Sequence, residues 1–226
     1  MLWEEGELLE GERHYYNPIF NKIYEGGIIL NLLFKLIISY LAFYLVIWFH
    51  ELGHSFFYWK YGCKENWLKV SVKPYLFFST PAPVDEEKAK QLTPKQNLIM
   101  SYGGIFVNLF LAFVISIIIQ ISPIKNNYIE LFVYQFVTLY LAEAISYLVL
   151  GNIYLVSDMK SIADTEPKLR PVNFILGIFI SVIYVMFIQQ LPQQIFSIVL
   201  IFNLIAIICM GGGRIVFTYY YSKRQQ

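Results

Sequence analysis

The segment His50-Glu51-Leu52-Gly53-His54 carries the residue types and the spacing of a zinc-binding helix. Residues four positions apart lie on one face of an α-helix, so the imidazoles of His50 and His54 can bind one metal ion. Glu51 is rotated by about 100 degrees from His50, which can place its carboxylate beside a water molecule at the metal. Such a carboxylate can take a proton from the water and later deliver it to the leaving amine. The pattern therefore predicts hydrolysis with Zn²⁺ as the cofactor.

The apolar surroundings of this segment favour a metal site over a chance match. The two histidines and the glutamate lie among Leu, Ile, Phe, Tyr and Trp residues. An acidic side chain near the centre of a bilayer costs about 2.5 to 3.5 kcal/mol on insertion scales. Such a cluster needs a partner, and one zinc ion supplies a partner for all three side chains.

The third zinc ligand is expected to be a carboxylate, because the remaining histidine, His14, lies in the polar N-terminal segment. Two acids fall in or next to an apolar segment, Glu143 and Asp158. Asp158 lies at the end of its span, at the depth expected for His50 and His54. Glu143 lies 15 residues earlier, or about 22 Å along a helix. Asp158 is therefore the preferred candidate for the third zinc ligand, and Glu143 is an alternative.

The elements that position these residues are membrane-spanning helices. The chain has 226 residues, of which 57% are hydrophobic and only 15% are charged, with a mean hydropathy of +0.53. A helix crosses the hydrocarbon core with about 20 apolar residues. Five stretches meet this length: residues 36–59, 98–122, 128–150, 171–190 and 193–217. The predicted fold is thus an all-α polytopic membrane protein with about five transmembrane helices, although the short connection around Pro192 leaves open whether the last two spans cross fully.

The one sizeable loop, residues 60–97, contains a pattern typical of a strand. Apolar Leu68, Val70 and Val72 alternate with polar residues over 67–73, which is the period of a half-exposed strand. Pro74 limits such a strand to the edge of a sheet. The sequence therefore predicts a small β-hairpin-like loop at about 67–80, whose edge can add an extended substrate segment.

The basic residues predict the orientation in the membrane. Across the five spans, 4 of the 17 Lys and Arg residues fall on the side of the N-terminus and the other 13 on the opposite side. Cytoplasmic segments near a membrane carry the excess of basic residues. The N-terminus is therefore expected outside the cytoplasm, with the C-terminus in the cytoplasm and the metal site towards the cytoplasmic side.

Three groups of residues resemble the site-2 proteases, and more closely their short members without appended soluble domains. The HELGH segment is the first. Residues 103–112 are similar to the family's Gly-Pro-x-x-Asn segment, and Asn152 with Asp158 is similar to its Asn-x-x-Pro segment followed by Asp-Gly. Leu155 and Met159 stand where the family usually has proline and glycine. The resemblance covers residues 36–170, and we expect one membrane domain over 1–226 with this core and further helices over 171–217.

The resemblance implies an intramembrane zinc metalloprotease that cuts transmembrane or membrane-associated proteins or peptides. His50, His54 and Asp158 would be the zinc ligands, with Asp164 a further alternative. Glu51 would be the catalytic base. Three more residues are expected to support the site or contact substrate: Gly104, Asn108 and Asn152.

Other classes of protein are less consistent with the residues. A non-proteolytic metal-binding membrane protein, either a zinc transporter or an inactive adaptor, is the alternative. A transporter has no need of Glu51 beside its histidines and usually places ligands on several spans. An adaptor would have lost Glu51 or a histidine. The net charge of +1 and the absence of a basic surface pattern give no support to nucleic acid binding.

Overall fold

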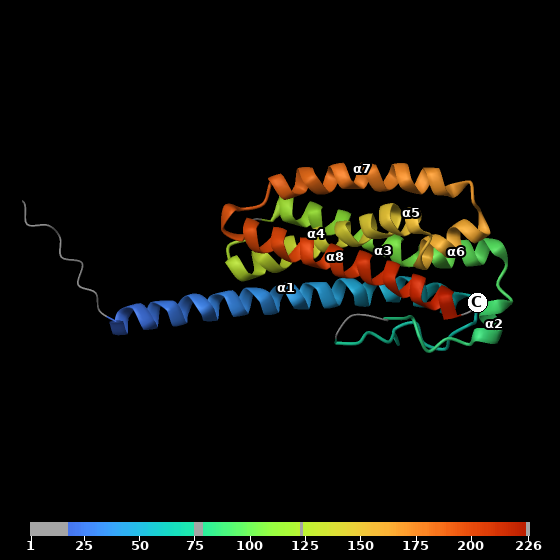
Figure 1. The fold of residues 1–226 in the computed structure, drawn as a ribbon, viewed down its shortest axis with the longest axis horizontal. Coiled ribbons are helices and arrows are strands. Elements are labelled where there is room, and N and C mark those ends of the chain that lie inside the picture. The colour runs from blue at the N-terminus through green and yellow to red at the C-terminus, as the bar shows by residue number, and fades with distance from the viewer. Residues whose placement is uncertain (1–17, 75–78, 123, 225–226) are drawn as a thin grey trace, which may run out of the picture. The chain divides into compact units, whose positions relative to one another are not determined.

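Helices make up most of the chain in the computed structural model, which describes residues 18–74, 79–122 and 124–224 (Figure 1). The described chain divides into two units at Phe34, and the second, Lys35–Gln226, carries the residues of interest. The elements are α1 (Pro18–Lys60), α2 (Glu86–Lys90), α3 (Pro94–Ile121), α4 (Asn127–Ile145), a π-helix (Ser146–Gly151), α5 (Asn152–Tyr154), α6 (Ser157–Thr165), α7 (Leu169–Gln189) and α8 (Gln193–Arg224).

The five predicted membrane spans are confirmed. Five helical segments are long and apolar enough to cross a bilayer: Gly27–Lys60, Pro94–Ile121, Asn127–Tyr154, Leu169–Gln189 and Gln193–Val216. The first helix begins earlier than the sequence predicted, because apolar residues continue before the single charge of Lys35. The last two spans are separate helices of 21 and 24 residues, and each is long enough to cross by itself.

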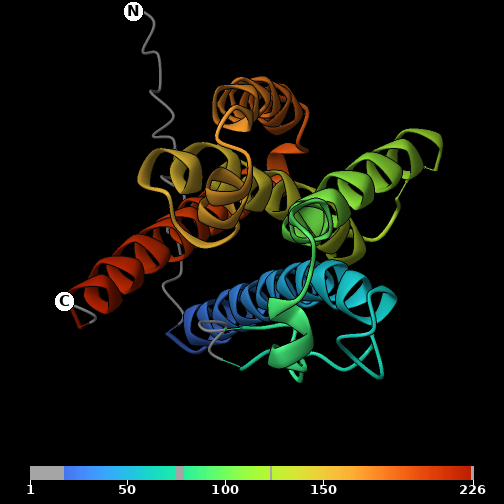
Figure 2. The ribbon, with the colours of Figure 1, turned by 90° about the vertical axis from the view of Figure 1, so that its right-hand side faces the viewer.

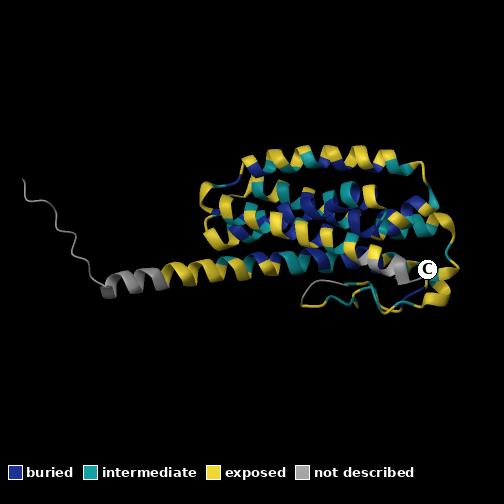
Figure 3. Cartoon of the chain, viewed as in Figure 1, coloured by how far each residue is buried: buried dark blue, intermediate teal, exposed yellow. Residues whose placement is uncertain are grey.

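Helix α4 is the central helix of the unit Lys35–Gln226. It packs against α3, α7 and α8, and the view along the helices in Figure 2 shows it among them. In its most apolar stretch 78% of residues are buried, against 22–33% in the other four spans. Figure 3 shows the same contrast, with buried residues along α4 and exposed ones on the outer side of α7. Side chains carried by α4 therefore lie in the interior of the bundle.

Two helices begin at side-chain caps that leave few backbone groups unsatisfied. Thr93 and Gln96 form a capping box at the start of α3, with Pro94 in the first turn. The side chain of Asn126 accepts hydrogen bonds from the backbone of Tyr128 and Ile129 at the start of α4. These caps define where the chain enters the membrane helices.

The loop between α1 and α3 differs from its prediction. The described residues contain no strand, and one isolated antiparallel bridge joins Ser71 to Thr80. The side chain of Asn66 turns the chain instead, by accepting a hydrogen bond from the backbone of Leu68. Leu68 is 52% exposed, so the alternating pattern buries no apolar face that would hold a longer strand. The tip of the predicted hairpin, residues 75–78, lies outside the described residues.

This loop is nevertheless anchored at both of its ends. The hydroxyl of Ser55 on α1 donates to the carbonyl of Trp67 at 2.7 Å. The ammonium group of Lys64 donates to the carbonyls of Pro81 and Pro83, at 2.5 and 2.9 Å. Burial lowers the pKa of Lys64, because the charged form loses its hydration. The loop is thus held against the end of α1 that carries the histidines.

Candidate metal centre

The last turns of α1 place three polar side chains in the interior. His50 is 1% exposed, Glu51 8% and His54 5%. The Nε2 atoms of His50 and His54 lie 3.1 Å apart, as the four-residue spacing predicts. The two imidazoles therefore direct their outer nitrogens at one point.

Asp158 reaches the same point from the first turn of α6. The π-helix Ser146–Gly151 and the short α5 end at a turn in which Leu155 and Ser157 both have φ of 52°. Residues other than glycine rarely adopt this left-handed conformation, and such strain is often found at functional sites. The turn reverses the chain so that Asp158 faces α1.

The three side chains fit a tetrahedral metal ion. Oδ2 of Asp158 lies 3.4 Å from Nε2 of His50 and 3.2 Å from Nε2 of His54. Zinc ligands at about 2.0 to 2.1 Å in a tetrahedron are about 3.3 Å from one another. Oδ2 of Asp158 is buried without a hydrogen-bond partner and converges with the Nε2 atoms of His50 and His54. One cation bound by all three residues would satisfy this arrangement.

The inner nitrogens of both imidazoles have partners. Nδ1 of His54 donates to the carbonyl oxygen of Met100 at 2.8 Å, which leaves its Nε2 free of a proton to bind a metal. Nδ1 of His50 lies 3.1 Å from the amide of Asn108, which is fully buried on α3. Metal-binding histidines usually have such a second partner, because it sets the tautomer and the ring orientation.

Two glycines of α3 allow it to approach α1 closely. A Cβ atom at Gly103 would lie 2.6 Å from the carbonyl oxygen of Gly53. A Cβ atom at Gly104 would lie 2.5 Å from Nε2 of His50 and 2.6 Å from Nε2 of His54. Small residues are what let membrane helices pack this closely. Gly104 therefore leaves space at the two nitrogens that would bind the metal.

Polar contacts hold α6, and with it Asp158, against α3 and α7. The hydroxyls of Ser101 and Ser161 lie 2.8 Å apart. The hydroxyl of Tyr102 donates to Oδ1 of Asn173 at 2.7 Å, and the amide of Asn173 contacts Sδ of Met159 at 3.8 Å. The contacts of Met159 and Ser161 lie within three residues of Asp158, so they help fix the position of its helix.

Asn152 supports the turn before Asp158. Its amide nitrogen donates to the carbonyl of Arg170 at 2.7 Å, and the Arg170 guanidinium donates back to the carbonyl of Asn152 at 3.3 Å. Its Oδ1 atom is buried without a partner. Asn152 thus ties α5 to the start of α7.

The two alternative carboxylates lie outside this group. Glu143, 1% exposed, forms an ion pair with Arg214 of α8, at 2.5 Å between Oε1 and Nη2. Asp164 is exposed and pairs with Lys160 at 2.6 Å. Among the described residues, the acid that lies beside both histidines is Asp158.

The imidazoles govern the charge state of Asp158. Burial is the largest single effect and raises the pKa of its carboxyl, but the charge that His54 and His50 carry when protonated, together with the hydrogen bonds that they then donate to the carboxylate, lowers the pKa more. The net pKa of Asp158 lies well below its usual range, so the carboxylate is ionised at neutral pH. An ionised carboxylate is the form that binds a metal.

Two residues near the metal centre were missed by the sequence analysis. The ring of Tyr147 stacks on His50, with centroids 4.7 Å apart and an angle of 5° between the planes. The guanidinium carbon of Arg214 lies 3.8 Å from the centroid of the same ring. Arg214 had a signal in the sequence, because an ionisable residue in an apolar span is a candidate functional residue. In the sequence, Arg214 counts only among the basic residues that predict the orientation.

Comparison with known proteins gives one match. A family model described as peptidase family M50 matches residues 38–226. No curated protein and no solved structure matches the chain. The match begins within the first candidate membrane helix, covers the other four, and includes His50, His54 and Asp158 of the candidate metal centre.

Proposed function

Since the chain belongs to peptidase family M50, the family of the site-2 proteases, we propose that it cuts transmembrane or membrane-associated proteins or peptides at a zinc centre. The family is one of membrane zinc metalloproteases, and the five apolar helices make the chain an integral multi-pass membrane protein. The alternative is a metal-binding membrane protein without proteolytic activity.

The convergence of three ligand atoms is the observation that carries this proposal. His50 and His54 lie on α1, and Asp158 lies on α6, 104 residues after His54. Their Nε2 and Oδ2 atoms nevertheless lie 3.1 to 3.4 Å from one another. Zinc, when bound there, would lower the pKa of a water molecule towards about 7 and polarise the carbonyl to be cut.

Glu51 is proposed as the general base and acid. It follows His50 directly on α1 and is buried beside the cluster. Its carboxylate would take a proton from the attacking water and pass that proton to the leaving amine. The carbonyl of Met100 would hold His54 in the tautomer that frees its Nε2, and the amide of Asn108 would orient the ring of His50. Asn152 would keep the Asp158 turn in place.

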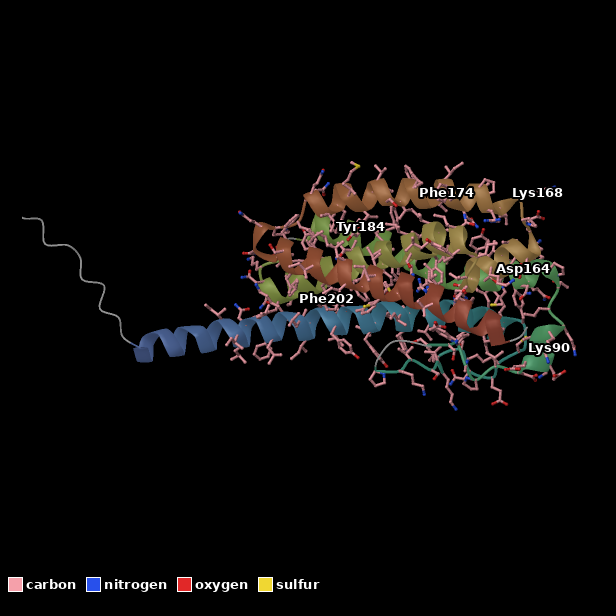
Figure 4. The ribbon with its side chains drawn as sticks, viewed as in Figure 1. Lys90, Asp164, Lys168, Phe174, Tyr184 and Phe202 are labelled. Carbon is pink, nitrogen blue, oxygen red and sulfur yellow. The ribbon has the colours of Figure 1, made fainter. Side chains whose placement is uncertain are left out.

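The active site is proposed to face the cytoplasm. Lys90 and Lys168 lie at the same end of the unit Lys35–Gln226 as Asp164 of α6 (Figure 4). The excess of basic residues on one side is the feature that marks the cytoplasmic face. A reporter fused after Gln226 tests this: a cytoplasmic signal supports the orientation, and an extracytoplasmic signal reverses it.

The activity is tested with purified protein in detergent and a panel of single-span membrane substrates. Wild type is compared with Glu51→Gln, and zinc is quantified in both by mass spectrometry. Glu87→Gln serves as the control, because it makes the same chemical change at an exposed acid of α2. We expect cleavage by wild type and the control, a loss of at least about a hundredfold in Glu51→Gln, and retained zinc in all three.

The other outcomes separate the alternatives. Zinc without cleavage by any of the three proteins would favour the non-proteolytic alternative. Absence of zinc from wild type would refute the metal centre. Unchanged cleavage in Glu51→Gln would remove the proposed role of Glu51.

A further inference from the structure

A buried ion pair lies one side chain away from the metal centre. Glu143 of α4 and Arg214 of α8 are joined at 2.5 Å, and their side chains are 2% and 19% exposed. The guanidinium also donates to the hydroxyl of Ser146 at 2.8 Å. A buried ion pair is costly to form and is weak evidence for stability, so its presence calls for another explanation.

The ion pair reaches the metal centre through one aromatic ring. The guanidinium of Arg214 lies 3.8 Å from the ring centroid of Tyr147, which is within the range of a cation–π interaction. The Tyr147 ring stacks on the imidazole of His50 with the planes 5° from parallel. A continuous set of contacts therefore runs from Glu143 through Arg214 and Tyr147 to His50.

Near Arg214, a glycine of α8 allows this helix to pack closely against the π-helix Ser146–Gly151. A Cβ atom at Gly211 would lie 2.6 Å from Cδ1 of Leu150 in the π-helix, so the glycine permits close packing there. The π-helix itself, Ser146–Gly151, carries Tyr147. Single π-helical turns within α-helices are frequent at functional sites because they redirect side chains.

We infer that Arg214 is a positioning residue of the metal centre, which holds the Tyr147 ring against His50 and so fixes the orientation of that ligand. This inference rests on the proposed function, because it requires that His50 bind the metal. Glu143 and Ser146 hold the guanidinium in place. The last helix of the chain then belongs to the catalytic unit, beyond the residues 36–170 covered by the resemblance.

The inference is tested with the double variant Glu143→Gln/Arg214→Gln, which removes the ion pair without leaving a lone buried charge. Cobalt(II) is used as the probe, because its visible absorption bands report ligand geometry and its titration gives a dissociation constant. The control is Asn203→Ala, which removes buried hydrogen bonds from the same helix. Asn203 lies 11 residues before Arg214, or about 16 Å along α8.

We expect the double variant to bind cobalt(II) about tenfold more weakly than wild type and to show shifted bands, since loss of an outer partner costs 10–100-fold in metal affinity. Asn203→Ala should lower the melting temperature and leave the dissociation constant and the bands unchanged. A double variant that is folded and has the wild-type constant and spectrum would overturn the inference, because a purely structural ion pair predicts that result.

A second pair of variants decides the matter if the double variant does not fold. Tyr147→Phe keeps the ring and should keep the wild-type constant, whereas Tyr147→Leu removes it and should weaken binding about tenfold. Equal constants for these two variants would overturn the inference. If wild type shows no cobalt(II) bands, the metal centre itself is refuted and this inference with it.

Discussion

Two carboxylates, the partly buried Asp158 and the buried Glu143, lie in the same helical unit but have different partners. Asp158 stands at the start of α6, and its Oδ2 atom faces the Nε2 atoms of two histidines with no aligned hydrogen bond. Glu143 stands inside α4 and is neutralised by Arg214. A buried acid must be paired, and the partner decides its chemistry. Glu143 already has a cationic partner in Arg214, whereas Asp158 has no Lys or Arg beside it among the described residues. Asp158 is therefore the acid that is suited to bind a metal ion.

The largest expected effect separates these two acids directly. Asp158→Asn should raise the zinc dissociation constant more than about a hundredfold, because loss of a ligand exceeds the 10–100-fold typical of outer partners. Glu143→Gln should raise it no more than about tenfold. Competition with a chromogenic chelator measures both constants. The reverse order would make Glu143 the ligand.

The second prediction compares a glycine from each region. Gly104→Ala places a methyl group against both Nε2 atoms, and overpacking of about 2 kcal/mol corresponds to roughly thirtyfold weaker zinc binding. Gly211→Ala meets the end of a flexible leucine side chain, so its effect should be less than about threefold. The same chelator assay measures both variants. Equal affinities would show that Gly104 does not border the metal.

The third prediction concerns the hydrogen-bond partner of His50. Asn108→Leu keeps the side-chain volume close to that of asparagine but removes the contact with Nδ1, so zinc affinity should fall about tenfold. Cleavage assayed at saturating zinc should recover in part, since the ligands remain. An unchanged affinity would assign Asn108 to helix packing alone.

The smallest effect is expected at the exposed acid next to the site. Asp164→Asn removes only the surface ion pair with Lys160, an i,i+4 contact of a kind that contributes about 0.3–0.5 kcal/mol. Its zinc dissociation constant should stay within about twofold of wild type. A larger loss would return Asp164 to the list of candidate ligands.

The sequence by itself determined the elements that depend on local patterns. The five membrane spans follow from runs of apolar residues, and the orientation of His50 and His54 follows from their four-residue spacing on one helix. The family was also recognisable from short segments around these residues and Asn108, and the family model agrees.

Only the tertiary structure decided which acid lies beside the histidines. The position of Asp158 depends on a π-helix, a left-handed turn and the packing of α6 on α3, none of which has a periodic signal in the sequence. In the loop between α1 and α3, by contrast, a periodic signal is present but the predicted strand does not form. Its alternating residues predicted a strand over 67–73, but no packed sheet is there to bury one face, so a single bridge forms.

The role inferred for Arg214 lies furthest from what the sequence determines. Its partners, Glu143 and Tyr147, are about 70 residues earlier in the chain and on another helix. A lone arginine in an apolar span indicates that a partner exists. Only the packing of α8 against α4 identifies that partner, because contacts between helices depend on how the helices are arranged and not on the spacing within either one.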